Sequence, residues 1–319
     1  MLTGGAGYIG STVAYDLIKF GHNVTIIDNL STGYKKLIPK KAFFYKTDIN
    51  NRSNLKKLFK MKKFDLVMHF AAYIKVDESV KKPKKYYVNN FDKTKIFFNS
   101  CIDYGITKII FSSTAAVYGN KLYKVKEGDK LLPKSPYAIS KLMCEKFIIK
   151  RSNQKKCKYI ILRYFNVAGS PKNLKTGLIA KKATHLIKKL CEFILGKKNN
   201  FFIYGNNYPT KDGTAVRDFI HLEDLSDIHL KSLAYIKKKI NKNILILNCG
   251  YGIGYSVKDI LSVAKKTYKL DYNVVRKRNG DLPFIVANCD KLKKTLKWKP
   301  KFNSIKKMID ISVKWEKKL

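Results

Sequence analysis

The chain has few acidic residues and no ordered cysteine pattern. It carries 23 aspartates and glutamates against 66 lysines and arginines, which gives a formal net charge of +43. Its six cysteines form no C-x-x-C pair and follow no regular spacing, which excludes the usual zinc motifs and a disulfide framework. No apolar run reaches the length of a membrane span. We therefore expect a globular cytoplasmic protein with buried thiols, without a metal and without a membrane partner.

The positive charge is spread along the whole chain. An excess of this kind ordinarily suggests nucleic acid or an anionic membrane as a partner. Here lysine pairs such as Lys35-Lys36 and Lys188-Lys189 lie mostly in turns or between apolar helix positions, and no RNP, zinc-finger or basic-zipper signature accompanies them. Abundant Lys, Asn, Ile, Phe and Tyr are typical of codon drift in an AT-rich genome. We expect no specific nucleic acid partner.

Strand and helix patterns alternate through the first half of the chain. Buried strands are predicted over 22–28, 42–48, 64–72, 108–119 and 158–169, with helices between them. This alternation predicts an α/β fold, a Rossmann-like doubly wound parallel sheet with a smaller mixed α/β C-terminal substrate domain. We expect a cofactor domain over 1–168 and a substrate domain over 169–319, with a segment near 215–240 packing back on the first. A ligand would lie in the cleft between them, over the carboxyl ends of the strands.

A glycine-rich loop begins the chain. Gly4, Gly7 and Gly10 in "TGGAGYIG" permit a tight turn and close approach to a pyrophosphate, and the amides of Tyr8 and Ile9 begin the following helix. Only Met1 and Leu2 precede the loop, so the first strand is either shortened or starts upstream. Asp28 ends the next strand near the position of a ribose-binding carboxylate, roughly 20 residues after such a loop. A carboxylate there repels a 2′-phosphate, so the sequence favours NAD over NADP.

Two further strand ends would reach the same edge of a parallel sheet. Asp48 and Ile49 follow the third predicted strand, and a carboxylate at this place could accept from the adenine amino group. Phe70 and Ala71 end the fourth strand, where small residues leave room for the cofactor backbone. Simple strand-end turns are the alternative for both pairs.

A tyrosine and a lysine four residues apart mark the candidate catalytic helix. In "PYAISK", Tyr137 and Lys141 lie on one helix face. A phenol has a pKa of about 10, so it becomes a proton acceptor near neutral pH only beside a cation such as Lys141. Ser112, Ser113 and Thr114 end the preceding strand and offer hydroxyls to a substrate alcohol. The pair predicts proton abstraction from an alcohol that is oxidised by hydride transfer.

These motifs, with "HFAA", "SSTAAVYG", "RYFNVAG", "YPTKDGTAVRDFIHLEDL" and "NGDLP", occur in order along essentially the whole chain. Together they resemble the UDP-glucose 4-epimerases of the extended short-chain dehydrogenase/reductase superfamily. The resemblance implies that Tyr137 takes the O4 proton, that Lys141 supports it, and that Thr114 holds the sugar O4. It implies oxidation at C4 by tightly bound NAD, rotation of the 4-keto sugar and return of the hydride, which interconverts UDP-glucose and UDP-galactose in galactose metabolism.

The resemblance also implies binding residues and a homodimer. Further cofactor contacts would come from Asn29, Lys75, Asn89 and Phe165. The UDP-sugar would be held by Asn166, His185, Leu186, Tyr204, Arg217, Arg278, Asp281 and Ile285, with the two arginines on the diphosphate and Asp281 on the uridine ribose. Paired arginines suit a pyrophosphate. For Arg217 the alternative is a surface ion pair with Asp218. We expect structural roles for His69 and His221.

Three features depart from the family pattern: the short first strand, Lys188 and Ile285. Lys188 stands where the family usually has proline. Ile285 has intermediate size beside the sugar, so acceptance of N-acetylated UDP-sugars stays open. A sugar-nucleotide 4,6-dehydratase or decarboxylase also oxidises C4, but a dehydratase needs acidic residues directly after the strand-end threonine. Ala115 and Ala116 occupy those positions. From another class, a basic nucleic-acid-binding protein on a Rossmann scaffold is the remaining alternative.

Overall fold

The computed structural model describes residues 1–319 with the exception of 155–156, 181–183, 239–242 and 279. The described chain packs as two compact units. The first comprises Met1–Val117, Pro133–Arg163 and Ser226–Leu247, and the second comprises Tyr118–Leu132, Tyr164–Leu225 and Asn248–Leu319. The chain therefore passes several times from one unit to the other.

A seven-stranded parallel sheet organises the first unit, with strand order β10-β6-β5-β4-β1-β2-β3. Its strands are β1 (Leu2–Thr3), β2 (Thr25–Asp28), β3 (Phe43–Lys46), β4 (Val67–His69), β5 (Lys108–Thr114), β6 (Lys158–Tyr164) and β10 (Ile244–Cys249). The short β1 pairs in parallel with β2 on one side and with β4 on the other. The order reverses at β1, as in the Rossmann fold, so the predicted fold class is confirmed.

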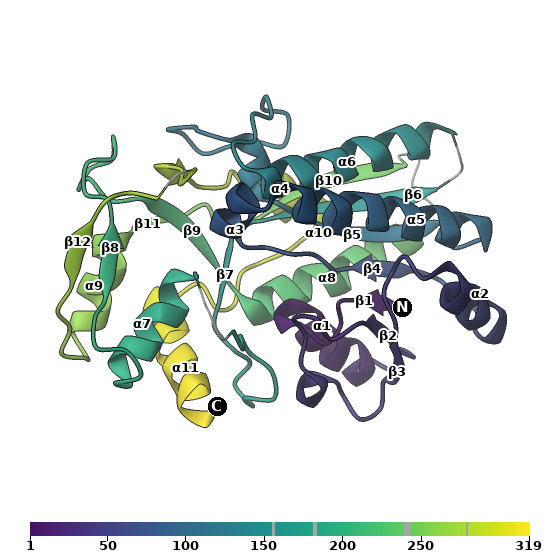
Figure 1. The fold of residues 1–319 in the computed structure, drawn as a ribbon, viewed down its shortest axis with the longest axis horizontal. Helices are drawn as coiled ribbons and strands as arrows, with labels where there is room; N and C mark the ends of the chain where they lie inside the picture. Colours follow the sequence, from purple (N-terminus) through teal and green to yellow (C-terminus); the bar gives the residue numbers. More distant parts are fainter. Residues whose placement is uncertain (155–156, 181–183, 239–242, 279) are drawn as a thin grey trace. The chain divides into compact units, whose positions relative to one another are not determined.

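Helices cover both faces of this sheet (Figure 1). On one face α2, α5 and α6 pack beside one another. On the other, α1 is joined to α8 by a 2.5 Å hydrogen bond from Ser226 Oγ to Asp16 Oδ2. The elements are α1 (Tyr8–Lys19), η1 (Lys35–Leu37), α2 (Arg52–Met61), α3 (Val76–Lys81), α4 (Pro83–Tyr86), η2 (Tyr87–Asp92), α5 (Lys93–Asp103), η3 (Ala115–Tyr118), α6 (Pro136–Gln154) and α8 (Leu222–Lys237).

An apolar core fills the space between the sheet and α2, α5 and α6. Ile27 of β2, Val67 of β4 and Ile109 of β5 meet Phe97 and Phe98 of α5, and all five side chains are fully buried. Continuous apolar strands of this kind are expected in a parallel sheet that is covered on both faces. The core fixes the strand ends where the predicted cofactor residues lie.

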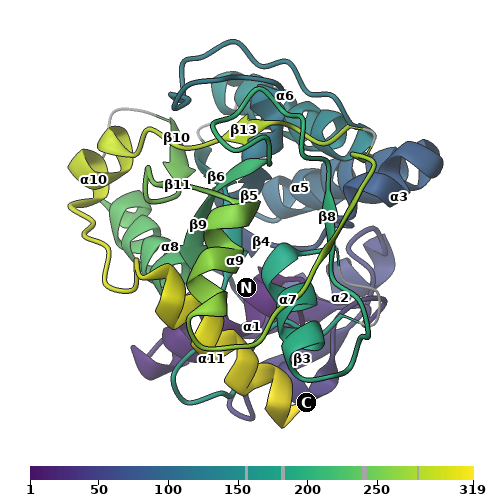
Figure 2. The same ribbon diagram turned by 90° about the vertical axis from the view of Figure 1, so that its left-hand side faces the viewer.

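The second unit is a mixed α/β structure. Its strands are β7 (Asn166–Ala168), β8 (Phe202–Tyr204), β9 (Val216–His221), β11 (Gly254–Ser256), β12 (Asn273–Val275) and β13 (Phe284–Ile285), and its helices are α7 (Leu186–Ile194), α9 (Val257–Lys265), α10 (Asp290–Leu296) and α11 (Ile305–Lys318). β9 pairs in parallel with β7 and β13 and antiparallel with β11, while β12 pairs with β8. Helix α11 packs against α7 and α9 (Figure 2).

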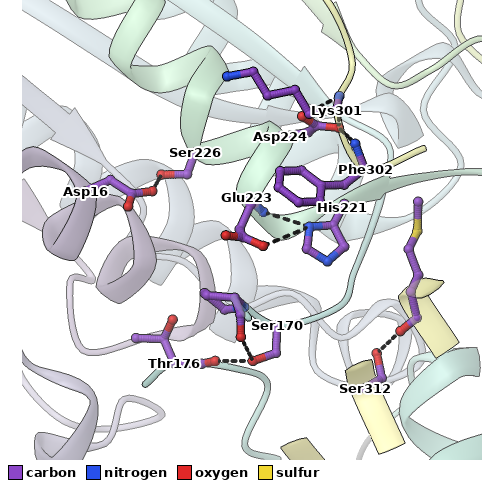
Figure 3. A network of polar contacts seen from close by, with 12 residues as sticks. Asp16, Ser170, Thr176, His221, Glu223, Asp224, Ser226, Lys301, Phe302 and Ser312 are labelled. Carbon is purple, nitrogen blue, oxygen red and sulfur yellow. Dashed lines mark hydrogen bonds and ion pairs between the residues drawn. The ribbon is translucent and has the colours of Figure 1, made fainter. Parts of the chain in front are cut away.

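A polar cluster fixes the segment that follows α10 to the start of α8 (Figure 3). The Asp224 carboxylate accepts hydrogen bonds from the backbone N–H groups of Lys301 and Phe302, at 3.1 and 2.9 Å, and from the Tyr251 hydroxyl at 2.5 Å. The His221 ring stacks on Phe302 with centroids 5.0 Å apart. Burial lowers the pKa of His221 to about 4, so the ring is neutral at neutral pH and packs as an aromatic side chain.

Candidate functional site

The glycine loop connects β1 to α1 without side chains in the way of a ligand. Gly4 has φ +69°, and a Cβ there would lie 2.6 Å from the backbone nitrogen of Ala71. A Cβ on Gly10 would lie 2.5 Å from the Gly4 carbonyl oxygen. Gly7 is the N-cap of α1 and makes no side-chain cap hydrogen bond. The loop therefore requires glycine for packing at two positions, and it leads into a helix N-terminus, which suits an anion.

Asp28 is tied to the glycine loop at the end of β2. Its Oδ2 accepts from Ala6 N at 3.0 Å and its Oδ1 accepts from Leu30 N at 2.8 Å. Burial raises its pKa, and the two backbone hydrogen bonds act in the opposite direction. An ionised carboxylate has about four acceptor sites, so each oxygen retains one for a ribose hydroxyl.

Asp48 lies after β3 as an ionised, oriented carboxylate. Its Oδ2 accepts from Lys93 Nζ at 2.7 Å and from the Asn29 amide at 2.9 Å. Burial alone would raise the pKa of Asp48, but these hydrogen bonds and that from Asn50 N bring it below the ordinary value. Asn29 is therefore held by Asp48, and the neighbouring Ile49 is buried in the core. The adenine role predicted for Asp48 and Ile49 stays a prediction.

The residues after β4 are fixed by a side chain that the sequence reasoning missed, Asn90. Its Oδ1 accepts from Tyr73 N at 2.8 Å, and its Nδ2 donates to Tyr73 O at 2.9 Å and to Ser140 Oγ at 3.2 Å. Asn89 donates to the same Oδ1 at 3.1 Å. Both asparagines lie in the π-helical turn η2, where one continuous helix was predicted. The wider turn directs the Asn90 side chain toward the loop after β4. In the sequence, only the adjacent pair Asn89-Asn90 could have drawn attention to this residue, and it does not indicate the turn itself.

Two other predicted cofactor residues lie beside this loop. Lys75 caps α3, and its backbone N–H donates to the Tyr86 hydroxyl at 3.1 Å. Phe70 N donates to Thr3 O at 3.0 Å, which ties the end of β4 to β1. Phe70 and Ala71 thus lie beside Gly4, whose missing Cβ makes room for Ala71. These features fit a dinucleotide in the first unit: a glycine-rich loop, a helix N-terminus and two oriented carboxylates.

The three candidate catalytic residues come together in the first unit. Tyr137 lies in the first turn of α6, near Thr114, the last residue of β5. Burial raises the pKa of Tyr137, and the nearby Thr114 hydroxyl partly lowers it. Thr114 Oγ1 also accepts from Ala116 N at 3.2 Å, which fixes its rotamer. A phenol and a secondary hydroxyl are therefore held side by side, as a proton acceptor for an alcohol requires.

Lys141 is buried one turn after Tyr137. Its Nζ lies 4.6 Å from the centroid of the Phe111 ring, and the residue is 3% exposed. Burial lowers its pKa to about 8, while Cys144 and Glu145 act to raise it. The ammonium is therefore present at neutral pH and close to its own titration range. His69, which we expected to be structural, is fully buried and hydrogen-bonded to Thr3 and Thr94, at 2.8 and 3.1 Å.

In the second unit, aromatic and basic residues surround Tyr204. The Arg278 guanidinium carbon lies 3.6 Å from the centroid of the Tyr204 ring, and Lys189 Nζ lies 3.4 Å from its hydroxyl oxygen. Burial alone would raise the pKa of Tyr204, but Arg278 and Lys189 lower it below the ordinary value. Lys189 was missed because surface lysines are common in this sequence. The group concentrates positive charge beside an aromatic face, which suits a nucleotide diphosphate.

Arg217 pairs with Asp281. Its Nη2 donates to Asp281 Oδ1 at 3.1 Å, so two predicted substrate residues lie together. The alternative partner, Asp218, is fully buried and instead accepts from the backbone nitrogens of Tyr251, Gly252 and Ala287. Arg217 is also paired across the sheet with Ile285 of β13. The ion pair with Asp218 that we considered for Arg217 is therefore not formed.

The other predicted substrate residues are at element ends in the second unit. Asn166 starts β7, opposite Phe219 of β9. His185 caps α7 and Leu186 begins that helix, while burial lowers the pKa of His185. Phe165 N donates to Cys249 O at 3.1 Å. Their binding roles stay predictions, because no contact with a ligand tests them.

Metal-binding clusters and membrane-spanning helices are both absent from the described residues. In the described ranges, no three His, Cys, Asp or Glu side chains gather in a way that could hold a metal ion. Within the same ranges, every helix is too short or too polar to cross a membrane.

The strand order, the glycine loop and the Tyr-x-x-x-Lys pair define a dinucleotide-binding α/β enzyme. Residues 1–250 match the model of the NAD dependent epimerase/dehydratase family. The UDP-glucose 4-epimerase of Azospirillum brasilense is 37% identical over 322 residues, covering 100% of this chain and 92% of that protein. The chain therefore belongs to the NAD dependent epimerase/dehydratase family, and its cofactor is NAD.

Solved structures agree with this assignment. The UDP-glucose 4-epimerase of Bifidobacterium longum in complex with NAD⁺ and UDP has a TM-score of 0.94 and 30% identity, covering 99% of this chain and 97% of that chain. The UDP-Glc/GlcNAc 4-epimerase of Campylobacter jejuni has a TM-score of 0.85 and 38% identity, covering 100% of this chain and 98% of that chain. The predicted resemblance, the Rossmann-like fold and an NAD-dependent epimerase are thus confirmed.

Proposed function

We propose that the protein interconverts UDP-glucose and UDP-galactose by reversible oxidation at the sugar C4. The observation that carries this proposal is Tyr137 close to the Thr114 hydroxyl, with the buried Lys141 one turn further along α6. The relatives named above support the substrate class, since their names specify UDP-glucose. The two domains expected from the sequence would have separate roles: residues 1–168 would bind NAD and residues 169–319 the UDP-sugar, with a segment near 215–240 returning to the first domain.

Each catalytic residue has a role that its surroundings support. Tyr137 takes the proton from the sugar O4 and later returns it. Thr114 orients that hydroxyl, because its own rotamer is fixed by Ala116 N. Lys141 stabilises the phenolate of Tyr137 with its positive charge and binds the cofactor ribose. NAD, when bound, supplies the hydride acceptor and donor at C4.

The nucleotide would be anchored while the sugar turns over. The cofactor contacts are those proposed above: the glycine-loop residues Gly4, Gly7, Tyr8, Ile9 and Gly10, with Asp28, Asn29, Asp48, Ile49, Phe70, Ala71, Lys75, Asn89 and Phe165. Arg217 and Arg278 would bind the diphosphate of the substrate and Asp281 the uridine ribose, with Asn166, His185, Leu186, Tyr204 and Ile285 as further contacts. Firm anchoring of the diphosphate leaves the sugar ring free to present its other face.

A dehydratase or decarboxylase is a weaker proposal. Ala115 and Ala116 follow Thr114, and Ala115 is 3% exposed, so neither position offers an acid or base. The test is incubation of the purified protein with UDP-glucose, with identification of the bound cofactor and of the C4 configuration of the product. We expect UDP-galactose and retained NAD; a 4-keto-6-deoxy sugar would overturn the proposal in favour of dehydration. A parallel incubation with UDP-N-acetylglucosamine measures how much room Ile285 leaves for the acetamido group.

Cellular role and assembly follow from the same proposal. We place the protein in galactose metabolism and in the supply of UDP-galactose for glycans. A cytoplasmic location is supported by its six cysteines, which are buried and form no disulfide in the described structure. A homodimer is supported by apolar side chains on elements that pack together, namely Val80 of α3, Val88 of η2 and Ile149 of α6, which are 44%, 41% and 37% exposed.

A further inference from the structure

A buried triad of Ser113, Glu145 and Arg163 lies next to the candidate catalytic residues in the sequence of β5 and α6. Arg163 Nη2 donates to Glu145 Oε2 at 2.7 Å, and Arg163 Nε donates to Glu145 Oε1 at 3.1 Å. Ser113 Oγ also donates to Glu145 Oε1. Glu145 and Arg163 are only 1% and 2% exposed. Two parallel N–H···O bonds hold the carboxylate in one orientation.

The triad connects the elements that carry the catalytic residues. Ser113 directly precedes Thr114 on β5. Glu145 lies four residues after Lys141 on α6, a spacing that puts both on one helix face. Arg163 lies on β6, the neighbour of β5 in the sheet. One carboxylate is thus bonded to both strands and carried by the catalytic helix.

We propose that Glu145 is a positioning residue of the active site, which orients Thr114 through Ser113 and supplies the negative charge that keeps Lys141 protonated. This inference deepens the proposed function, on which it rests. Arg163 holds the carboxylate in place. A merely structural triad would fasten β5, α6 and β6 together without any influence on the charge of Lys141.

The groups around Lys141 support an electrostatic role for Glu145. Burial lowers the pKa of Lys141 to about 8, against the opposing influence of Cys144 and Glu145. Burial also raises the pKa of Cys144 to about 12, so its thiol is neutral at neutral pH. On β4, burial and Lys141 hold the pKa of His69 well below its usual range, so that ring is neutral as well. Glu145 therefore carries the negative charge that acts on Lys141.

Other titratable groups face the same region without replacing that charge. Asp92 in η2 acts on Cys144, and Tyr137 acts on Tyr86 of α4. Burial and Glu78 raise the pKa of Tyr86 far above its usual value, so Tyr86 is neutral. Without Glu145, the buried Lys141 and Arg163 would lose the carboxylate between them. Lys141 would then lose its proton at a lower pH.

The test is a direct titration of Lys141. Protein labelled with ¹³C at the lysine Cε and loaded with NAD is titrated by NMR, and the Lys141 signal is identified by its absence in Lys141→Met. Ordinary lysines titrate near pH 10.4, which separates them from a midpoint near 8. In Glu145→Gln, which keeps the shape of the side chain, we expect the midpoint to fall by on the order of one unit. The upper limb of the kcat/KM profile should move in the same direction.

Two control variants separate charge from packing. Ser113→Ala removes one hydrogen bond of the triad but no charge, so we expect turnover to fall about tenfold with the Lys141 midpoint unchanged. Asp310→Asn makes the same charge change in the exposed Lys306–Asp310 pair, and should alter neither quantity. An unchanged midpoint in folded Glu145→Gln would overturn the proposal, and so would an equal shift in Asp310→Asn.

A second variant covers the case in which Glu145→Gln does not fold because Arg163 is left buried without a partner. Glu145→Gln with Arg163→Met removes both charges, and we expect a smaller downward shift of the Lys141 midpoint. No shift in that folded double variant overturns the proposal. The titration uses no UDP-sugar, so its outcome is independent of the proposed function. If the variants show the expected shifts of the Lys141 midpoint but the wild-type protein does not epimerise UDP-glucose, the proposed function alone is refuted.

Discussion

Tyr137 and Gly7 are the residues at which the proposed chemistry and the proposed cofactor site can be separated from folding. Both lie in the first unit, one at the start of α6 and one at the start of α1. Neither belongs to the apolar core: the Tyr137 hydroxyl lies near Thr114, and Gly7 has no side chain. Changes at these positions should therefore affect function more than stability.

Replacement Tyr137→Phe removes the proton acceptor and keeps the ring. We expect turnover of UDP-glucose to fall by about 10²- to 10⁴-fold, because general base catalysis contributes on that order. Binding of UDP and retention of NAD should stay close to wild type, as measured by calorimetry and by cofactor release on denaturation. Tyr123→Phe, at a side chain that is 51% exposed, serves as the control. Wild-type turnover in Tyr137→Phe would refute the assigned base.

Gly7→Ala tests the cofactor loop. A Cβ at Gly7 would meet only the Gly4 carbonyl oxygen at 3.2 Å, whereas a Cβ at Gly4 would collide with the backbone at Ala71. We expect Gly7→Ala to cost less than about 1 kcal/mol of folding stability. NAD affinity should weaken about tenfold, which corresponds to ~1.4 kcal/mol, because the methyl group hinders approach of the pyrophosphate to the loop.

The control for this loop variant is Gly21→Ala. Gly21 has a positive φ, +80°, whereas Gly7 has φ −87°, and a Cβ at Gly21 has open space around it. Its substitution strains the end of α1 without approaching the loop, so stability should fall while NAD affinity stays unchanged. Equal NAD affinity in Gly7→Ala and wild type would argue against a pyrophosphate at this loop.

At the scale of elements, the periodic segments of the Rossmann sheet were predictable from sequence. Strands β2, β3, β4, β5 and β6 all lie inside the predicted ranges, because each is a short apolar run between turn residues. Gly21 follows the last turn of α1, with φ +80° and its N–H bonded to Ile18 O. The π-helical turn at Asn90 was not predictable, since one extra residue in a helical turn leaves no periodic signature.

Pairs between distant charged residues were also beyond sequence reasoning. Lys188 of α7 was noticed only because it departs from the family pattern, and its partner Glu316 of α11 is 128 residues away. Both residues are buried, at 8% and 3% exposure, and Lys197 also donates to Glu316, at 2.9 Å. A helix pattern indicates which face is apolar, but it does not indicate which single polar residue on that face finds a partner.

This pair should fasten α11 to α7. We expect Glu316→Gln to lower the free energy of unfolding by about 3 kcal/mol, because it leaves Lys188 buried with Glu192 as a more distant partner at 3.6 Å. Lys188→Met combined with Glu316→Leu should be within about 1 kcal/mol of wild type, since no buried charge remains. Urea unfolding measures both. Asp310→Asn, in an exposed pair on α11, should cost less than about 0.5 kcal/mol.

If the double variant proved as unstable as Glu316→Gln, packing rather than charge would explain the loss. The start of α7 carries His185 and Leu186, so the same variants also show whether α11 influences UDP binding. A weaker affinity for UDP with unchanged stability would indicate that coupling.

At the scale of the whole molecule, the net charge of +43 should produce non-specific attraction to polyanions. We expect binding to DNA of any sequence at low salt, with log affinity falling linearly against log salt concentration, and little binding at about 0.15 M salt. Fluorescence anisotropy with two unrelated duplexes measures this. Epimerisation should be unaffected by DNA at that salt concentration. Salt-resistant, sequence-selective binding would instead favour a nucleic acid function.

The alkylation rates of the six buried thiols can report local unfolding of the molecule. Cys101, Cys144 and Cys157 lie in the first unit, and Cys191, Cys249 and Cys289 in the second. Burial raises the pKa of Cys101, Cys144, Cys191, Cys249 and Cys289, so these thiols react slowly with alkylating reagents while folded. Labelling at each cysteine then waits for local unfolding around it. Mass spectrometry of partly alkylated protein would thus time the opening of each unit separately, without any engineered probe.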